Sequence, residues 1–191
     1  MKQIHIMTVG ISLLTNFERA TGLPRKDSLK KHPQLLAFLE QAPERASAEM
    51  NAFLTRTGVL KSRTRAEYGV RLVYTNTAEC KLVSGLLKKY LGKQGIQDVG
   101  LIALDALNLP ASGAPDQAYA QKLAEKGLAD LRQHVLEQVN KLQRQDPGLD
   151  IQFNVTGGYK AEVAVLYELG RFLRLPVYYL HETYKTCIVL P

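Results

Sequence analysis

The sequence predicts an α/β protein with a Rossmann-like, mainly parallel open sheet that carries helices on both faces. Short apolar segments of strand length alternate with amphipathic segments of helical period along the chain, which is the pattern of right-handed β-α-β crossovers. Hydrophobic residues make up 46% and charged residues 23% of the 191 residues, as in ordinary globular proteins. We find neither an internal repeat nor a linker, so a single domain is expected over residues 1–191.

Six segments have the length and the apolar character of strands. The first follows the initial Met1 closely, and it lacks the basic cluster and the small-residue cleavage site of a signal peptide. No apolar run reaches the roughly 20 residues that a membrane span needs, so we expect a cytoplasmic protein without a membrane partner. The predicted strands are residues 4–9, 70–74, 99–104, 151–155, 177–180 and 186–190.

Four segments between the strands have apolar residues at three- and four-residue spacing, which predicts helices. Pro43 is expected to break or kink the first of them, and Pro147 ends the third. Residues 24–33 are polar and basic, and residues 108–115 are rich in Pro, Gly and small residues, so both are expected to be loops. The predicted helices are residues 33–56, 82–91, 128–142 and 161–173.

The positive charge of the chain favours an anionic partner without identifying it. The formal net charge is +7 and the sequence pI is about 9.4, with basic residues densest at residues 61–65 and 25–31. A nucleic-acid surface, a site for a polyphosphate ligand and merely solvated loops all fit this charge. The sequence has no helix-turn-helix or aromatic RNA-binding signature, so direct DNA binding is not expected.

Several residues that can carry chemistry are expected to have structural roles only. Cys80 and Cys187 lack metal or redox spacing, and burial is their expected state. His5 lies in a strand and is expected to be packed. Arg25 and His32 have the R-x(4–6)-H spacing of HEPN ribonucleases, but that motif belongs to an all-helical domain and here falls in a predicted loop. We therefore interpret it as coincidental.

Polar residues and glycines gather where three of the predicted strands end. They occupy residues 8–16, 75–79 and 154–162. In an open parallel sheet, ligands bind beyond the carboxyl ends of the strands, where the loops enter helices. These three junctions therefore predict the ligand site of the protein.

The third junction is the most informative of the three. Gly157 and Gly158 allow the backbone to approach a ligand closely, and the helix that follows offers unpaired N–H groups to an anion. Lys160 adds a mobile positive charge. The spacing is not that of a P-loop, and Gly10 does not begin a G-x-G-x-x-G run, so no nicotinamide or flavin cofactor is expected. A tight strand-to-helix turn without a ligand remains the alternative explanation of the glycine pair.

Two segments together resemble a known family. Val-Gly-Ile-Ser-Leu-Leu-Thr-Asn at residues 9–16 and Asn-Val-Thr-Gly-Gly-Tyr-Lys at residues 154–160 are similar to CRISPR-associated Rossmann-fold (CARF) proteins, most of all to the stand-alone ring nucleases of cyclic tetraadenylate. Val-Tyr-Tyr-Leu-His-Glu at residues 177–182 extends the resemblance over nearly the whole chain. The resemblance implies a homodimer whose two-fold axis passes through a ring-shaped cyclic oligoadenylate, with each subunit presenting the same loops.

The resemblance also implies roles for individual residues. Ser12 and Lys160 match the residues that such ring nucleases use for cleavage, with no metal and no cofactor. The alternative role of Thr75 or Thr77 is that of a helix cap only. His181 is expected to contact either the ligand or the dimer partner. The expected ligand-binding residues are Gly10, Ile11, Leu13, Thr15, Asn16, Thr75, Asn76, Glu79, Asn154, Thr156, Gly157, Gly158, Tyr159 and His181.

The chemistry implied by the resemblance is attack of a ribose 2′-hydroxyl on the neighbouring phosphorus, which leaves a 2′,3′-cyclic phosphate. The protein then needs to align the 2′-oxygen with its leaving group. Lys160 is expected to stabilise the charge on the phosphorane, and the Ser12 hydroxyl to bond to phosphate oxygens. Slow turnover is expected without a strong base. A CARF sensor that binds the ligand without cutting it remains the alternative, and a ring of four or of six adenylates fits the sequence.

Overall fold

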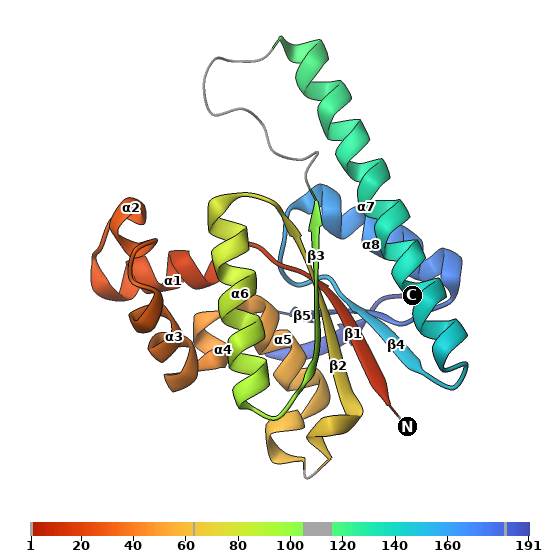
Figure 1. Cartoon of the computed structure of the whole chain (residues 1–191), viewed down its shortest axis with the longest axis horizontal. Coiled ribbons are helices and arrows are strands. Elements are labelled where there is room, and N and C mark those ends of the chain that lie inside the picture. The colour runs from red at the N-terminus through yellow and green to blue at the C-terminus, as the bar shows by residue number, and fades with distance from the viewer. Residues whose placement is uncertain (1, 63, 105–115, 182) are drawn as a thin grey trace.

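Six strands form one sheet between two layers of helices (Figure 1). The computed structural model describes residues 2–62, 64–104, 116–181 and 183–191. The strand order is β3-β2-β1-β4-β5-β6, with all neighbours parallel except β5 and β6. The predicted fold class is therefore confirmed. The strands are β1 (Gln3–Thr8), β2 (Tyr68–Thr75), β3 (Asp98–Leu104), β4 (Asp150–Asn154), β5 (Val177–His181) and β6 (Thr186–Val189).

The chain reverses its direction of travel across the sheet between β1 and β4. From β1 it moves outward to β2 and β3, and it then returns to the other side of β1 to add β4, β5 and β6. Gln3 is level with both Tyr68 and Asp150, and Met7 with Asn154, so β1 and β4 end at the same height. Such a switch point leaves a crevice at the carboxyl ends of the two strands, where open α/β sheets bind their ligands.

Each face of the sheet has its own hydrophobic core because side chains alternate along the strands. In β1, Met7 faces one helix layer, while Ile4 and Ile6 face the other. Six of the described helices lie on the side of the first core and two on the side of the second. The first layer consists of α1 (Ser12–Thr21), α2 (Arg25–Ser28), α3 (His32–Gln41), α4 (Pro43–Ala46), α5 (Ala48–Thr57) and α6 (Ala78–Lys93), and the second of α7 (Gln117–Gln145) and α8 (Lys160–Leu173).

The first helix layer differs from the sequence prediction in three places. Residues 12–21 form α1, which was not predicted, and residues 24–33 contain α2 and the start of α3 instead of a loop. The predicted helix over residues 33–56 is three helices. Pro43 begins α4 after the break, as its missing N–H requires, and Ser47 begins α5 by accepting a hydrogen bond from the Met50 N–H. The loop predicted at residues 108–115 lies outside the described residues.

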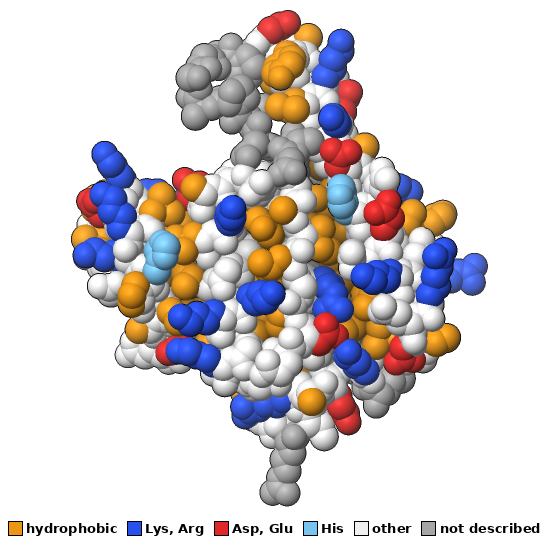
Figure 2. Space-filling view, viewed as in Figure 1, with side chains coloured by type: hydrophobic (Ala, Val, Ile, Leu, Met, Phe, Trp, Pro, Cys, Tyr) orange, Lys and Arg blue, Asp and Glu red, His pale blue; other side chains and the backbone are white. Residues whose placement is uncertain are grey.

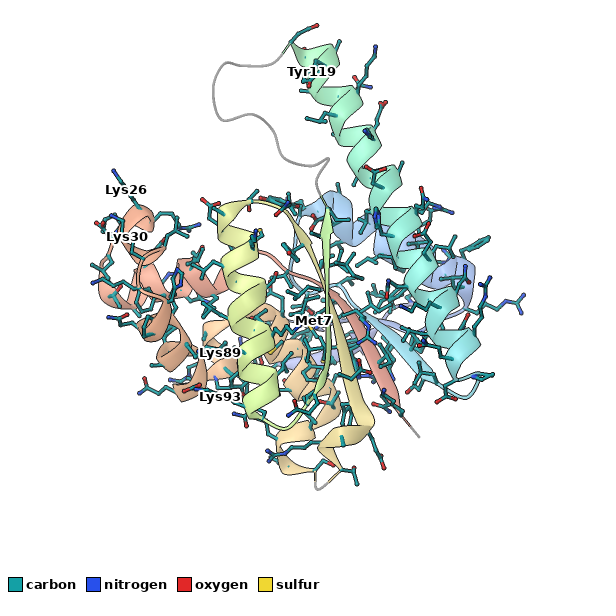
Figure 3. The ribbon with its side chains drawn as sticks, in the orientation of Figure 1. Met7, Lys26, Lys30, Lys89, Lys93 and Tyr119 are labelled. Carbon is teal, nitrogen blue, oxygen red and sulfur yellow. The ribbon has the colours of Figure 1, made fainter. Side chains whose placement is uncertain are left out.

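The long helix α7 has no buried residue in its first ten positions, residues 117–126. Its buried residues begin at Gly127, and the preceding turns extend away from the body of the protein, with Tyr119 near the tip (Figures 1 and 3). Tyr119 is 56% exposed. None of the described helices is both long and apolar enough to cross a membrane.

His5 is fully buried, as predicted, in the layer between the sheet and α5. Its ring lies edge-on to Phe53 and Tyr178, and its Nδ1 is 2.9 Å from the Tyr178 hydroxyl oxygen. Burial, with a smaller contribution from nearby Arg56, lowers the pKa of His5 to about 3. Cys80 is buried as predicted, whereas Cys187 is only partly buried.

Candidate functional site

The loops that follow β1 and β4 are in direct contact at the switch point. The Thr8 hydroxyl donates a hydrogen bond to the Gly157 carbonyl, and a Cβ on Gly10 would lie 3.1 Å from the Gly158 nitrogen. Gly158 has φ = +93°, and a Cβ there would lie 2.6 Å from the Thr8 Cβ. Glycine is therefore required at this position by backbone conformation and by space. The structure brings the first and third predicted junctions together.

A buried carboxylate that the sequence analysis did not single out lies between the two loops. Glu49, the second residue of α5, has no exposed surface. Its Oε1 accepts a hydrogen bond of 2.8 Å from the Gly10 N–H, and its Oε2 accepts bonds of 2.8 Å from Ser12 and 2.7 Å from Ser47. A Cβ on Gly157 would lie 2.2 Å from Oε1. Glu49 therefore fills the space that the glycines leave.

Ser12 is the first residue of α1, and its hydroxyl group is already engaged. The hydroxyl donates to Glu49 Oε2 and accepts a hydrogen bond of 3.1 Å from the Ala48 N–H. A serine hydroxyl has one hydrogen and two lone pairs. In this arrangement one lone pair of Ser12 Oγ has no partner among the described residues, and the hydroxyl hydrogen is not available as the donor that the sequence predicted.

Lys160 begins α8 directly after the glycine pair. Its side chain is exposed, and within the described part of the chain it forms no hydrogen bond or ion pair. The start of α8 is fixed by Glu162, whose Oε2 accepts a 3.0 Å bond from the Tyr159 N–H and whose Oε1 accepts a 2.8 Å bond from the Thr75 hydroxyl. Burial raises the pKa of Glu162. Among the described residues, Lys160 therefore has no partner, and it stands on a helix start that Glu162 caps.

Several predicted ligand-binding residues lie beneath the site rather than on its surface. Thr75 and Asn154 are each 1% exposed, and Leu13 is fully buried. Asn154 donates to the Glu49 carbonyl and accepts from the Thr156 N–H, while Thr75 bonds to Glu162. These side chains support the loops. The helix cap that was weighed for Thr75 or Thr77 is Thr77, which accepts from the Cys80 N–H.

The second junction contributes two half-buried polar residues at the carboxyl end of β2. Glu79 is the second residue of α6. Asn76 donates its backbone N–H to the Leu104 carbonyl at 3.0 Å, which ties the turn to the end of β3. Ile11, just before α1, is half-buried, and Tyr159 is 53% exposed beside Lys160.

A basic groove adjoins the loops on the β5 side. It has a volume of about 710 Å³, and Asn16 and Thr156 connect it to the paired loops. Its basic side chains, Arg19, Arg45 and Lys185, are exposed and form no ion pair with any described residue. Lys185 has φ = +50°, an uncommon backbone conformation for a lysine. The groove is lined by Asn16, Arg19, Glu44, Arg45, Ala48, Asn51, Thr55, Thr156, Leu180 and Lys185.

A smaller hollow of about 390 Å³ shares Thr156 and Leu180 with the basic groove and contains His181. The His181 ring stacks on Tyr184 with 4.3 Å between the ring centroids. His181 thus lies at the end of β5, where the sequence analysis placed it, beside the groove.

Arg25 and His32 lie on short helices of the first layer and not in a loop, which corrects that expectation. Arg25 forms an ion pair with Glu18 and donates to the Thr15 hydroxyl at 3.2 Å. His32 is the first residue of α3. Arg25 thereby joins α2 to the middle of α1, and its bond engages the Thr15 hydroxyl.

Basic residues away from the groove are dispersed. Lys26 and Lys30 point outward beside α2, and Lys89 and Lys93 point outward from α6 (Figure 3). Lysine and arginine side chains are spread among acidic and apolar ones over the face in Figure 2, without forming one stripe. Among the residues that the structure describes, no three His, Cys, Asp or Glu side chains are grouped to hold a metal ion.

Comparison with known sequences places most of the chain in one family profile. Residues 44–191 match the family described as CRISPR-associated protein (Cas_APE2256), which is more than three quarters of the chain. No curated protein matches the chain.

Three solved structures match nearly the whole chain. Protein VC1899 from Vibrio cholerae matches 98% of this chain with 12% identity and a TM-score of 0.56. Csm6 from Enterococcus italicus, bound to cyclic hexa-2′-fluoro-hexa-dAMP, matches 100% with 9% identity and a TM-score of 0.50. Can2 from Sulfobacillus thermosulfidooxidans, in complex with cyclic tetra-adenylate, matches 98% of this chain with 13% identity. Its TM-score of 0.46 is too low to show a shared fold.

The chain spans only part of each of these proteins, namely 33% of VC1899, 41% of Csm6 and 34% of Can2. At such low identities the first two structures show a shared fold and nothing about shared chemistry.

Proposed function

The chain belongs to the Cas_APE2256 family of CRISPR-associated proteins, and from this premise we propose that it binds a cyclic oligoadenylate and cleaves it. Cyclic tetraadenylate is the proposed ligand. The proposed reaction is metal-independent attack of a ribose 2′-hydroxyl, which produces linear adenylates ending in a 2′,3′-cyclic phosphate. Removal of the messenger would switch off type III CRISPR signalling.

One observation supports this proposal: Lys160, which has no partner among the described residues, and Ser12, which is hydrogen-bonded, follow the two loops that meet at the switch point of the sheet. Ser12 begins α1 and Lys160 begins α8, and the loops before them are in contact between Gly10 and Gly158. The exposed lysine at this point can attract a phosphate group. The binding of a cyclic hexa-adenylate analogue by Csm6, which shares the fold, supports the same class of ligand here.

The groove supports a ligand larger than a mononucleotide. Its volume of about 710 Å³ continues from the paired loops along α5 and is lined by Arg19, Arg45 and Lys185. These three basic side chains outnumber the one acid of the groove, Glu44, and form no ion pair with any described residue, so the local potential favours a polyphosphate. We assign the phosphates nearest the loops to Lys160 and part of the ring to this groove.

A homodimer is part of the proposal because the ligand is symmetric. A two-fold axis through the ring allows each subunit to offer its own Ser12 and Lys160 to one half of the ligand. In this arrangement the protein aligns the 2′-oxygen with its leaving group, and Lys160 stabilises the charge that develops on the phosphorane.

A CARF sensor that holds the ring intact is the second candidate. The observation that favours it is the hydrogen bonding of Ser12, whose hydroxyl hydrogen is taken up by Glu49. A serine so engaged fits a structural role at the start of α1 as well as a chemical one.

The test compares binding and cleavage in the same samples. Cyclic tetraadenylate, cyclic hexaadenylate and linear tetraadenylate are titrated into the protein in EDTA by calorimetry, and each mixture is then separated by chromatography after several hours. We expect tightest binding of cyclic tetraadenylate and its conversion to linear products. Tight binding with an intact ring would favour the sensor, and no binding of either ring would overturn both candidates.

A further inference from the structure

Glu49 is a buried acid at the centre of the site, and its surroundings are unusual for a structural carboxylate. It has no exposed surface, and within the described residues no lysine, arginine or histidine forms an ion pair with it. Its partners are a backbone N–H and two serine hydroxyls. Burial of a carboxylate is costly unless it is compensated, so an acid in this position calls for an explanation beyond packing.

A second buried carboxylate at the same edge of the sheet gives the contrast. Glu162 closes the first turn of α8 by accepting the Tyr159 N–H and also accepts the Thr75 hydroxyl, which is the work of a helix-capping acid. Ser47 performs the capping of α5 by itself. Glu49 directs its oxygens at Gly10 and Ser12, which belong to the candidate site.

The hydrogen bonds of Ser12 have a definite direction. Its hydrogen is donated to Glu49 Oε2, one lone pair receives the Ala48 N–H, and one lone pair is left. The free lone pair can accept a hydrogen bond from a ligand hydroxyl. It is polarised by the carboxylate behind it, because linked hydrogen bonds strengthen one another.

We propose that Glu49 is a positioning residue that takes, through Ser12, the proton lost by the attacking ribose 2′-hydroxyl. This inference rests on the proposed function. The 2′-O–H bond breaks as its proton passes to Ser12 Oγ, while the Ser12 proton passes to Glu49 Oε2. The 2′-oxygen forms its bond to phosphorus, and the P–O5′ bond breaks with its electron pair on the 5′-oxygen, which takes a proton from solvent. Glu49 then returns its proton to solvent by the same route.

Other candidates for this proton are placed elsewhere. The His5 side chain lies between the sheet and α5 with its Nδ1 bonded to Tyr178, and Glu162 is bonded to Thr75 and Tyr159. His181 belongs to the smaller hollow at the end of β5. Glu49 is the carboxylate in direct contact with Ser12.

The variant Glu49→Gln tests the proposal because an amide fits the same space. Its oxygen can accept the Gly10 N–H, while its NH₂ group can donate to Ser12 and Ser47, whose hydroxyls rotate to accept. The hydrogen bond to Ser12 is thereby kept with its direction reversed, and the proton acceptor is lost. Glu162→Gln is the matched control, since it also removes a buried carboxylate at this edge.

Two quantities are measured for each variant: the single-turnover rate on cyclic tetraadenylate in EDTA, and the Kd for the same ring with fluorine in place of the 2′-hydroxyls, which cannot react. We expect Glu49→Gln to slow the reaction by about 100-fold or more while the Kd stays equal or falls. Glu162→Gln is expected to change the rate only a few-fold. Ser12→Ala and the double variant Ser12→Ala/Glu49→Gln are expected to react equally slowly, because Ser12 and Glu49 belong to the same proton path.

The outcomes separate this inference from the proposed function. If the wild-type protein binds the ring without cutting it, both fail. If the wild-type protein cuts and Glu49→Gln cuts as fast, or if its rate and affinity fall together, Glu49 takes no proton and the inference alone fails. If Glu49→Gln does not fold, Glu49→Asp is used instead, because its shorter side chain holds the carboxylate farther from Ser12. This variant is expected to cleave more slowly at an unchanged Kd. Full activity of Glu49→Asp would contradict the proposal.

Discussion

Glu49 and Ser12 are 37 positions apart in the chain, yet the Ser12 hydroxyl donates a 2.8 Å hydrogen bond to the Glu49 carboxylate. This contact joins the start of α1 to the start of α5. It also fixes which way the Ser12 hydrogen points, and so whether Ser12 meets a ligand as a donor or as an acceptor. The chemistry proposed for the site depends on that direction.

Lys160→Ala is expected to reduce the cleavage rate of cyclic tetraadenylate by about 100- to 1,000-fold, because it removes the cation that stabilises the developing charge. The side chain is exposed and unpaired in the described part of the chain, so the melting temperature should not change. Rates come from chromatography of timed samples. Lys126→Ala, at an exposed position in α7, is the control and should cleave normally. Wild-type rates in Lys160→Ala would remove the lysine from the mechanism.

Gly157→Ala is expected to destabilise the protein by about 1–3 kcal/mol, because the new Cβ would lie 2.2 Å from Glu49 Oε1. Displacement of Glu49 should also slow cleavage. The free energy of unfolding is measured in urea. In the control Gly85→Ala, the new methyl group meets nothing within 4 Å, and in the middle of α6 it should stabilise by about 0.5–1 kcal/mol. Equal stabilities of the two variants would contradict this description of the loop.

Lys185→Asn is expected to weaken binding of the ring roughly 10-fold and to make the Kd less dependent on salt, because one charge in the basic groove is lost. Asparagine tolerates the positive φ of this position, so the turn between β5 and β6 should be kept. Calorimetry at several salt concentrations gives the slope. Arg144→Ala, at an exposed position in the last turn of α7, serves as control. If both variants bind alike, the groove does not hold the ligand.

His5 should make the protein sensitive to acid. Its pKa is lowered to about 3 in the folded protein, whereas the unfolded chain takes up the proton near pH 6.5. Between these values the unfolded state binds more protons, so the free energy of unfolding falls as the pH decreases from 6.5 toward 3. His5→Phe should flatten this dependence in urea titrations, although it leaves the Tyr178 hydroxyl without its partner. The exposed His134→Gln should not flatten it.

The strands were predictable from the sequence because a buried parallel strand needs a continuous apolar run. Residues 99–104 and 177–180, for example, correspond to β3 and β5 within a residue at each end. The alternation of strands with helices was then enough to predict the fold class. It also predicted the edge of the sheet at which the polar junctions meet. The resemblance to CARF proteins is confirmed by the family match.

The helices between β1 and β2 were predicted less well, since their bounds depend on packing and local backbone geometry. Leu13, Leu14 and Phe17 form the apolar face of α1, but the sequence analysis treated residues 8–16 as a polar junction after the first strand and predicted no helix there. The break at Ser47 was hidden inside an unbroken apolar period. Ser47 followed by Glu49 is a helix-start signal. It was the only local feature that could have drawn attention to Glu49.

The position of Glu49 beside Gly10 and Gly157 could not be predicted from sequence patterns. It follows from the turn between α4 and α5 and from contacts between residues 39 and 108 positions apart. Hydrophobic periodicity describes one element at a time and contains no such information. The same holds for the direction of the Ser12 hydrogen bond.

The most direct test of metal-independent ring cleavage is a single-turnover experiment with radiolabelled cyclic tetraadenylate and excess wild-type protein in EDTA. We expect slow, complete conversion to linear adenylate ending in a 2′,3′-cyclic phosphate, identified by mass spectrometry. A ring that is bound but remains intact over many hours would contradict it and leave a sensor of the cyclic messenger.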